Sequence, residues 1–567
     1  MADLLVKNGT IVDGTGAKAY AADLRIKDGV IVEIGQDLDS QGEHELDASG
    51  AFVAPGFIDG HTHVDPALWW DQSCDPLPGH GVTTVVTGNC SLSLAPIKLE
   101  NKDILTDMFC FIEDIPNHCF DDGIPWNWSS WAEYKQAFNS HGAAVNVVPL
   151  VGHSALRLHV IGEQAFERAS TDSERKEIAA LTEECLKAGA FGLSTSFVDV
   201  DRRGRPVPSR AADNEEFAAM VAKMKDLGRG LFEFVPRLLA RDTQIADIER
   251  VHNLCRDAGI PATWTQLYLG DNNKDWIEPL LTQAERTLKE GPGVYAQVSP
   301  RSFDNNLSMV ATSMFSAIPA WHDVVQADSA GKRALLEDEE WRAQARRDYD
   351  SDRPSNFPKN CPERVIFSRT IKPELQQYIE KSLADYAEYR NLHLSDALAE
   401  WVLLNDLDPG ITLRSQAYDA DKICELMKHP ATILSGTDFG AHVQMMCGAG
   451  DTTLMIERFV TERGDYSLEE AIKGMTSDLA QLFGIFDRGV LVQGMAGDLA
   501  IFSTDEIDWP GEFMVDDLPG GASRLTRPGG GYRATVVSGV PTYLNGEYTH
   551  DLPGRMLEPL PREVQSP

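Results

Sequence analysis

The chain has 567 residues, 43% of them hydrophobic, which is enough for a large core and for one large barrel with attachments. Lysine and arginine total 51 against 87 aspartates and glutamates, a formal net charge of −36. So acidic a chain repels nucleic-acid phosphates and anionic membrane surfaces, so we expect neither as a partner. The sequence contains no apolar run of about 18 residues that would span a membrane.

Two features of the sequence indicate the cellular compartment of the protein. The first residues, MADLLVKNGTIVDG, are typical of a strand and turn and not of a signal peptide. The nine cysteines show no paired spacing, which is typical of reduced thiols. We therefore expect a cytoplasmic protein that acts on a small molecule; whether it forms a homo-oligomer is left open.

Both ends of the chain have the pattern of antiparallel sheet. LLVKNGTIVDG and DLRIKDGVIVEIG alternate like strands and carry NG and DG turn signals. The same strand-like pattern occurs again in GDLAIF at 497–502 and in YRATVVSGVPTYLNGEY at 532–548. The pattern predicts one small β-sandwich domain built from residues 1–54 and 486–567.

The middle of the chain alternates short apolar segments with helical patterns, such as the one at 171–189. Repeated strand–helix units predict an α/β fold, a TIM-like (β/α)8 barrel over residues 55–485. Residues from about 300 to 400 are charged and predict a helical insertion. The apolar segments are TTVVTG (83–88), AVNVVPLVG (144–152), AFGLSTS (190–196), GLFEFV (230–235), ATWTQLYL (262–269), GVYAQV (293–298) and ATILSG (431–436).

The strongest local motif is APGFIDGHTHVD at 54–65, in which a strand ends just before His61 and His63. Residues two apart in an extended segment point to the same side, so the two imidazoles can bind one metal ion. Surface histidines are the alternative for an isolated HxH pattern, but the preceding PGFID makes this combination more specific.

These motifs resemble the amidohydrolase superfamily, and more narrowly its D-aminoacylase branch, the N-acyl-D-amino-acid deacylases. The resemblance rests on KNGTIVDG, PGFIDGHTH, GVTTVVTGNC, VGHSALR, GLSTS, SGTDFGAH and GMAGDLAIF, which occur in the family's order. It spans nearly the whole chain except the insertion, and it implies a metal-dependent hydrolase.

The resemblance implies a role for four residues. His61 and His63 match the metal ligands of the first strand. Cys90 matches the cysteine that binds zinc in this branch, and a thiolate suits zinc; a small buried hydrophobic residue is the alternative. Asp438 in LSGTDFG matches the last-strand aspartate, which touches the metal and takes the proton from the attacking water. An aspartate of a turn is the alternative.

The sequence departs from the family on strands five and six, where two further histidines are expected. Val235 or Phe234 stands at the first position and Gln266 at the second. Glu233 is two residues from the gap and either replaces the missing ligand through its carboxylate or is an ordinary strand glutamate. We therefore expect one zinc per chain, and a second metal is left open.

A second departure concerns the substrate. The family carries an arginine soon after the last-strand aspartate, associated with the substrate's carboxylate, but none occurs here before Arg458. Arg157 and Arg237 are the candidate replacements. His153 and His442 are candidates for binding the substrate or orienting Asp438, and a structural role is the alternative for both.

Apolar residues lie near the metal-site positions in the sequence. The candidates for a substrate pocket are Trp69, Trp70, Met445, Met446 and Cys447. They favour a bulky apolar or aromatic substrate, unless they only pack the top of the barrel.

The expected function is hydrolysis of an amide, an N-acyl amino acid or a related apolar or aromatic amide, through a metal-activated water. The alternatives are a cyclic amide, urea, imide or ester as the substrate, or a non-catalytic barrel that has lost part of its metal centre. Retention of His61, His63, Cys90 and Asp438 together argues against the last, because folding alone does not require that set.

Overall fold

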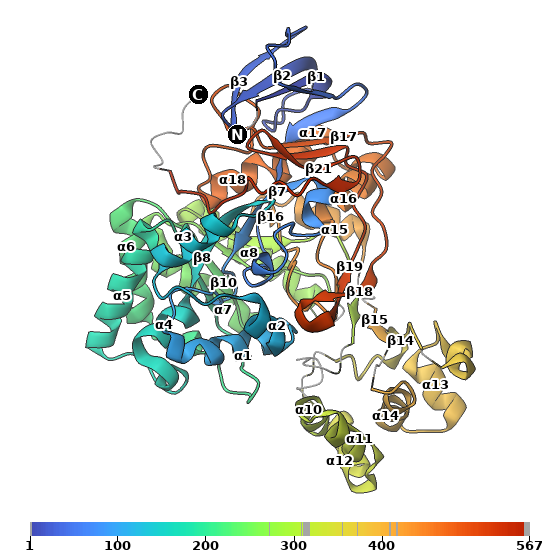
Figure 1. Ribbon diagram of the computed structural model, residues 1–567. Coiled ribbons are helices and arrows are strands. Elements are labelled where there is room, and N and C mark those ends of the chain that lie inside the picture. The colour runs from blue at the N-terminus through green and yellow to red at the C-terminus, as the bar shows by residue number, and fades with distance from the viewer. Residues whose placement is uncertain are drawn as a thin grey trace.

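The computed structural model describes residues 3–270, 273–307, 309, 318–353, 355, 357–370, 372–407, 410–414 and 418–560. A barrel occupies the centre of the molecule, a sheet made from both ends of the chain lies on one side, and the insertion projects on another (Figure 1).

The barrel consists of eight parallel strands that pair in chain order. Each apolar segment of the middle region overlaps one of them, so the predicted barrel is confirmed. The strands are β6 (Phe57–Asp59), β7 (Val82–Thr87), β8 (Asn146–Gly152), β9 (Gly192–Ser196), β10 (Phe232–Val235), β11 (Ala262–Trp264), β12 (Val294–Val298) and β16 (Thr432–Leu434).

The ends of the first and last strands meet through backbone hydrogen bonds. The Asp438 amide donates to the His61 carbonyl at 3.1 Å, and the His63 amide donates to the Phe439 carbonyl at 2.7 Å. Gly440 follows with φ +87°, and a side chain there would lie 2.8 Å from the His63 backbone, so glycine is required. These contacts bring the two predicted catalytic segments together.

Helices follow the barrel strands and pack outside them. The predicted helix at 171–189 is α5 (Asp172–Lys187), which begins with a capping box between Thr171 and Glu174. The others are α1 (Lys102–Ile112), α2 (Asn117–Gly123), α3 (Trp131–His141), α4 (His153–Ile161), α6 (Asn214–Leu227), α7 (Arg241–Cys255), α8 (Ile277–Glu290), α15 (Ala420–Met427), α16 (Asp451–Leu454), a π-helix (Met455–Glu462), α17 (Leu468–Met475) and α18 (Ser477–Phe483).

A nine-stranded sheet combines both ends of the chain, as predicted. Its N-terminal strands are β1 (Leu4–Ile11), β2 (Tyr20–Lys27), β3 (Val30–Gly35), β4 (His44–Asp47) and β5 (Phe52–Pro55). Its C-terminal strands are β17 (Leu499–Phe502), β20 (Ala534–Val537), β21 (Val540–Leu544) and β22 (Glu547–Tyr548). The hairpin of β18 (Phe513–Leu518) and β19 (Ala522–Thr526) pairs separately. The domain boundaries at 54/55 and 485/486 stay a prediction.

One of the expected tight turns proved wrong. Asp28-Gly29 joins β2 to β3, and Asn545-Gly546 joins β21 to β22, each with positive φ at both residues. Asn8-Gly9, however, lies inside β1, where the register with β2 shifts between Val6 and Gly9. The Asn8 amide there donates to Asp23 at 2.8 Å, so this NG forms a bulge and not a turn.

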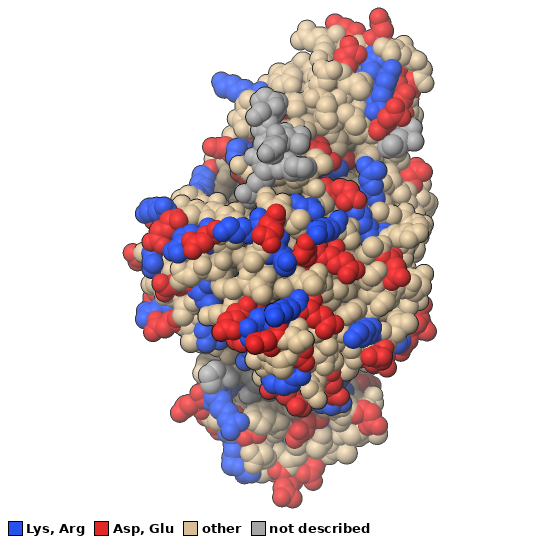
Figure 2. Space-filling view, turned by 90° about the vertical axis from the view of Figure 1, so that its left-hand side faces the viewer, with Lys and Arg blue, Asp and Glu red and all other residues tan. Residues whose placement is uncertain are grey.

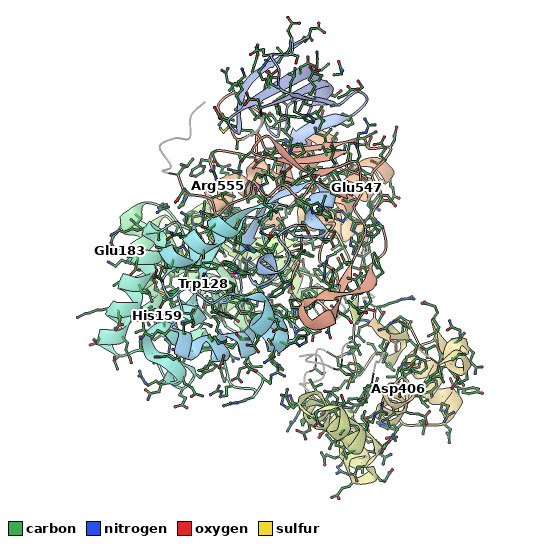
Figure 3. The ribbon with its side chains drawn as sticks, viewed as in Figure 1. Trp128, His159, Glu183, Asp406, Glu547 and Arg555 are labelled. Atoms are coloured by element: carbon green, nitrogen blue, oxygen red, sulfur yellow. The ribbon has the colours of Figure 1, made fainter. Side chains whose placement is uncertain are left out.

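The insertion has a hydrophobic core of its own, in which the Phe367 and Trp401 rings stack with centroids 3.8 Å apart. It projects from the barrel, with Asp406 on it (Figures 1 and 3). It is helical as predicted but also contains a three-stranded sheet. Its elements are β13 (Asn305–Asn306), α10 (Pro319–Gln326), α11 (Ser329–Glu337), α12 (Glu339–Tyr349), β14 (Val365–Phe367), α13 (Leu383–Arg390), α14 (Leu394–Leu404) and β15 (Ile411–Leu413).

The charged side chains mix both signs on the surface. Figure 2 shows acidic and basic groups interspersed over one face. Within the described ranges, no helix has both the length and the apolar character needed to cross a bilayer.

Candidate metal centre

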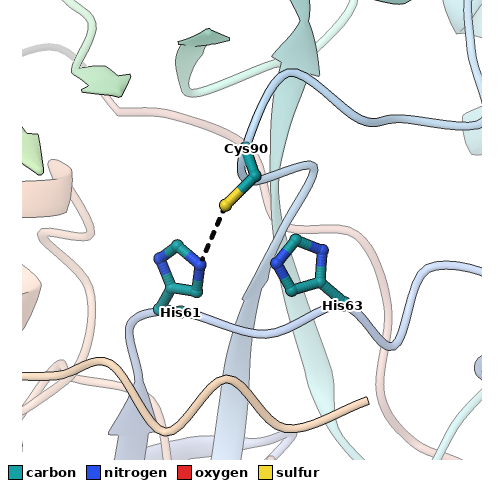
Figure 4. Close-up of side chains that lie close together, drawn as sticks. All are labelled: His61, His63 and Cys90. Atoms are coloured by element: carbon teal, nitrogen blue, oxygen red, sulfur yellow. Dashed lines mark hydrogen bonds between the residues drawn. The ribbon is translucent and has the colours of Figure 1, made fainter. Parts of the chain in front are cut away.

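Three potential metal ligands converge where the first two barrel strands end (Figure 4). His61 and His63 follow β6, Cys90 follows β7, and all three are buried. Their ligand atoms lie within 4.8 Å of one another, and Cys90 Sγ is 3.3 Å from His61 Nε2. The two histidines therefore do lie on one side, as their spacing predicted.

Asp438 faces this cluster from the last strand. Its Oδ1 lies 3.4 Å from His63 Nε2 and 3.7 Å from His61 Nε2. The side chain is 24% exposed, unlike the two histidines, so a solute can reach it. Its φ of +58° is a strained conformation for aspartate, which is typical of functional positions.

Three of the separations between donor atoms fit a tetrahedral ion. Zinc bonds of about 2.0 Å to nitrogen and about 2.3 Å to sulfur place neighbouring donors roughly 3.3–3.7 Å apart. The three short separations in the cluster, 3.3, 3.4 and 3.7 Å, fall in that range. Two imidazoles, a thiol and a carboxylate are also the donor types that zinc prefers.

The carboxylates around the cluster favour the binding of a cation. Burial raises the pKa of the Cys90 thiol well above its usual value, and the carboxylates of Glu233, Asp438 and Glu113 raise it further. A thiol in such surroundings ionises readily only when a metal ion binds it.

The two histidines differ in their electrostatics. Burial lowers the pKa of His61 to about 3. Burial also disfavours the charged form of His63, but with no metal ion bound the carboxylates of Glu113 and Asp438 outweigh it and raise the pKa of His63 to about 10. A metal ion at Nε2 requires the neutral imidazole and displaces this proton. Burial acts to raise the pKa of Asp438, yet contact with His63 keeps that pKa below its usual range.

Neither gap on strands five and six is filled by a histidine. Val235 and Phe234 are buried apolar residues, and Gln266 donates to the Gly436 carbonyl at 2.6 Å. Glu233 is fully buried, and its Oε2 accepts a hydrogen bond from the Cys90 amide at 2.9 Å. Its Oε1 has no hydrogen-bond partner among the described residues. Glu233 therefore supports the loop that carries Cys90.

His153 and Arg157 share one buried carboxylate instead of lining a pocket. Glu216 accepts from His153 Nε2 at 2.7 Å and from Arg157 Nη1 at 2.5 Å. All three side chains are at most 1% exposed. Both residues therefore form part of the protein interior, and the Glu216 carboxylate already neutralises the charge of Arg157.

Of the residues predicted to form a substrate pocket, Trp70 and Met446 line one cavity, whereas Met445 and Cys447 are buried and are not among its described lining. This cavity has a volume of about 370 Å³, and its described lining includes none of His61, His63, Cys90 and Asp438. Val64 and Phe439, which directly follow His63 and Asp438, also line it. Trp69 instead stacks on Trp128, with ring centroids 4.7 Å apart, inside the core.

His442 lies near the catalytic aspartate candidate. Its Nε2 is 3.9 Å from Asp438 Oδ2, and its side chain is 28% exposed. It is therefore close enough to contact a molecule bound at the cluster.

Two carboxylates near the centre were missed by sequence reasoning. Glu113 Oε1 lies 3.2 Å from His63 Nδ1, and Asp199 acts on the same histidine at longer range. Glu113 comes from the apolar stretch MFCFIEDIP, where acidic residues are unusual, and Asp199 follows the end of β9. These were the available signals.

Comparison with known families shows which enzymes share this organisation. The sequence model of the amidohydrolase family matches residues 44–543, most of the chain. The chain belongs to the amidohydrolase family. This amidohydrolase is therefore a metal-dependent hydrolase of carbon–nitrogen bonds, as the resemblance implied.

Individual relatives of this amidohydrolase are deacylases. The N-acyl-D-aspartate deacylase of Alcaligenes xylosoxydans xylosoxydans is 28% identical over 88% of this chain and 86% of its own. The structure of the Bordetella bronchiseptica N-acyl-D-glutamate deacylase, complexed with zinc and a phosphonate inhibitor, is 23% identical, covers 98% of this chain and 99% of its own and has a TM-score of 0.67. A D-aminoacylase with a binuclear metal centre also has a TM-score of 0.67, at 22% identity, covering 98% of this chain and 100% of its own.

Proposed function

We propose that this amidohydrolase binds one zinc ion through His61 Nε2, His63 Nε2 and Cys90 Sγ, with Asp438 at its open side. The observation that carries the proposal is the convergence of His61, His63 and Cys90, whose ligand atoms all lie within 4.8 Å of one another, with Asp438 Oδ1 3.4 Å from His63 Nε2. A zinc ion held there supplies a Lewis acid that polarises the amide carbonyl and lowers the pKa of a water molecule.

Asp438 is proposed as the group that moves the proton. Its Oδ1 lies 3.4 Å from His63 Nε2, so the carboxylate faces the open side of the proposed ion, where it can accept a proton from the attacking water. Its partial exposure leaves room for the substrate. The same carboxyl group then protonates the leaving nitrogen, which completes hydrolysis of the amide. His442 is placed to hydrogen-bond the substrate beside it.

A single ion is proposed because strands five and six offer few ligands. Valine and phenylalanine cannot bind a metal, and the Gln266 amide nitrogen is engaged with Gly436. Glu233 has one unpartnered oxygen and is the residue through which a second ion would bind. The relative with a binuclear centre keeps that alternative open.

We propose an apolar or aromatic amide as the substrate, without a required carboxylate. The relatives' names point to N-acyl amino acids, which carry one. In this chain, however, Arg157 is paired with Glu216, and Arg237 is paired with Asp247 at 2.7 Å. The cavity of about 370 Å³ is of a size that binds small molecules.

Two further arginines bear on the rival substrate. Arg524 lines the cavity but is ion-paired with Asp75 at 2.9 Å and with Asp517 at 2.8 Å. Arg210 is the other. Its Nη1 donates to the carbonyls of Val198 and Asp199, and its side chain is exposed. If a carboxylate is required after all, Arg210 is the side chain to test. A cyclic amide, urea, imide or ester remains the alternative bond, and a binding protein without catalysis the alternative class.

The experiment is a hydrolysis assay on purified protein, metal-free and zinc-loaded, with amides that vary in hydrophobic size and in carboxylate. Zinc-dependent release of the amine from carboxylate-free aromatic amides supports the proposal. Zinc binding without turnover of any amide or ester would favour the non-catalytic alternative.

Two broader assignments belong to the same proposal. The cytoplasm is the proposed location, because nine cysteines without paired spacing are typical of a reducing compartment. A small molecule is the substrate of this enzyme family, and association with further copies of the chain is left open.

A further inference from the structure

Glu113 and His63 face each other in the interior beside the metal centre. The Glu113 carboxylate is 2% exposed, and its Oε1 lies 3.2 Å from His63 Nδ1. Neither atom meets hydrogen-bond geometry with any described residue, so the ion-pair distance between them is the contact that each one makes. Two polar atoms buried without other partners, at ion-pair distance, are expected to interact with each other.

The position of Glu113 is fixed from both sides. Its amide donates to the Phe109 carbonyl at 2.8 Å, which closes the last turn of α1. Its own carbonyl accepts from the Val443 amide at 3.3 Å, in the loop that follows Asp438. The carboxylate is therefore held by a helix end and by the last-strand loop, and not by the strand that carries His63.

We propose that Glu113 is a positioning residue for the metal centre. A neutral imidazole carries one N–H, and a carboxylate beside Nδ1 favours the form in which that nitrogen is protonated. His63 Nε2 then presents its lone pair toward Asp438 and the ligand cluster, 3.4 Å from Asp438 Oδ1. Carboxylates behind metal-bound histidines commonly raise metal affinity in this way.

This role is specific to one of the two histidines. The group beside His61 is the Gln297 amide, which is neutral. Among the described residues, Glu113 thus contacts the ring of a proposed histidine ligand on its Nδ1 side, whereas Asp438 faces the Nε2 atoms of both rings. The inference rests on the proposed metal ligands.

The test measures zinc affinity of the full chain by competition with a chelator, for wild type, Glu113→Gln, Glu113→Ala and Asp199→Asn. Glu113→Gln keeps an acceptor oxygen of the same size and removes the charge; Glu113→Ala removes both. Asp199→Asn is the matched control, because Asp199 acts electrostatically on His63 without an ion-pair contact to it. Melting of each metal-free variant checks its fold.

We expect zinc affinity to fall roughly ten- to a hundredfold in Glu113→Gln, and further in Glu113→Ala. Asp199→Asn should stay within about threefold of wild type. The visible spectrum of the cobalt-substituted protein should change in the Glu113 variants alone, which a purely structural role would not produce.

Affinity in both Glu113 variants within threefold of wild type overturns the inference while the proposed metal centre stands. An equal loss in Asp199→Asn also overturns it, because general charge and not contact would then be responsible. If wild type itself binds neither zinc nor cobalt, the proposed function fails and the inference fails with it.

Discussion

The Thr437 hydroxyl lies 2.9 and 2.8 Å from the two carboxylate oxygens of Asp59. It also lies 3.0 Å from the His61 carbonyl. Asp59 belongs to the first barrel strand and Thr437 follows the last, so this contact joins the two segments that carry the metal-site candidates. Arg301 stabilises the same contact between the two segments by donating a hydrogen bond to the Thr437 carbonyl at 2.5 Å. The placement of Asp438 beside His61 thus depends on a buried polar network.

Replacing Thr437 by valine should weaken the contact between the first and last barrel strands. Valine keeps the shape but leaves Asp59 without its hydroxyl donor, and an unsatisfied buried group costs about 1–3 kcal/mol. Thr437→Ser retains the hydroxyl and serves as the control. The measurement is the free energy of unfolding in urea. Equal stability of the two variants would mean that the network contributes nothing.

Asp438→Asn tests the proposed proton transfer. The side chain is partly exposed, so the variant should melt near the wild-type temperature. Asparagine cannot accept a proton from water, and the turnover rate should fall roughly a hundredfold or more. Steady-state kinetics on the best amide measure the effect.

A variant that retains most of its activity would assign the proton transfer to another group. His442 would be the next candidate, because it lies 3.9 Å from Asp438 and is partly exposed. His442→Gln, assayed alongside, separates the two.

The buried cluster of Glu216, His153 and Arg157 should make stability depend on pH. Burial opposes ionisation of Glu216, but His153 and Arg157 outweigh it and lower its pKa to about 2 from the usual 4.5. A carboxyl group with a lower pKa in the folded state stabilises fully above about pH 4.5, and the contribution is lost as the pH falls toward 2. Glu216→Gln removes this contribution.

At neutral pH Glu216→Gln should be less stable than wild type by about 3–5 kcal/mol, because Arg157 is left buried without its partner. The difference should shrink as the pH falls below about 4.5. Glu425→Gln, in an exposed pair with Lys422, is the control and should change little. Denaturant unfolding from pH 7 to pH 3 measures both. A difference that stays constant with pH would contradict the assignment to Glu216.

The substrate proposal predicts a dependence on hydrophobic size. Lengthening the acyl or aryl group should raise kcat/KM by about tenfold for each 1.4 kcal/mol gained in the transition state. Leu525→Trp narrows the cavity from the β19 side, far in the chain from the metal ligands. It should reduce kcat/KM for large amides and spare small ones.

If hydrolysis requires a carboxylate on the substrate, and if acyl length has no effect on kcat/KM, the pocket does not select for apolar size. Arg210→Ala would then be expected to abolish the preference, because Arg157 and Arg237 are engaged in ion pairs.

Much of the barrel was predictable because its strands are buried apolar segments between helical patterns. The metal-ligand candidates were predictable because they follow strand ends, where parallel strands of a barrel present their side chains together. The roles of these residues still rest on proposals.

Features that depend on tertiary contacts were not predictable. Arg157 stood in a motif next to a strand, yet its partner Glu216 lies on another helix. Trp69 and Trp70 are adjacent in the chain, but one packs in the core and the other lines the cavity. Glu113 reaches His63 from α1, and no spacing rule connects the two positions.

Metal titration of the stripped protein tests the central claim most directly. Zinc is added in known amounts while bound metal and amide hydrolysis are both followed. The account predicts that activity rises in proportion to zinc and levels off at one equivalent per chain, and that His63→Ala and Cys90→Ala prevent this rise. Full activity without metal, or activity that appears only with the second equivalent, would contradict it.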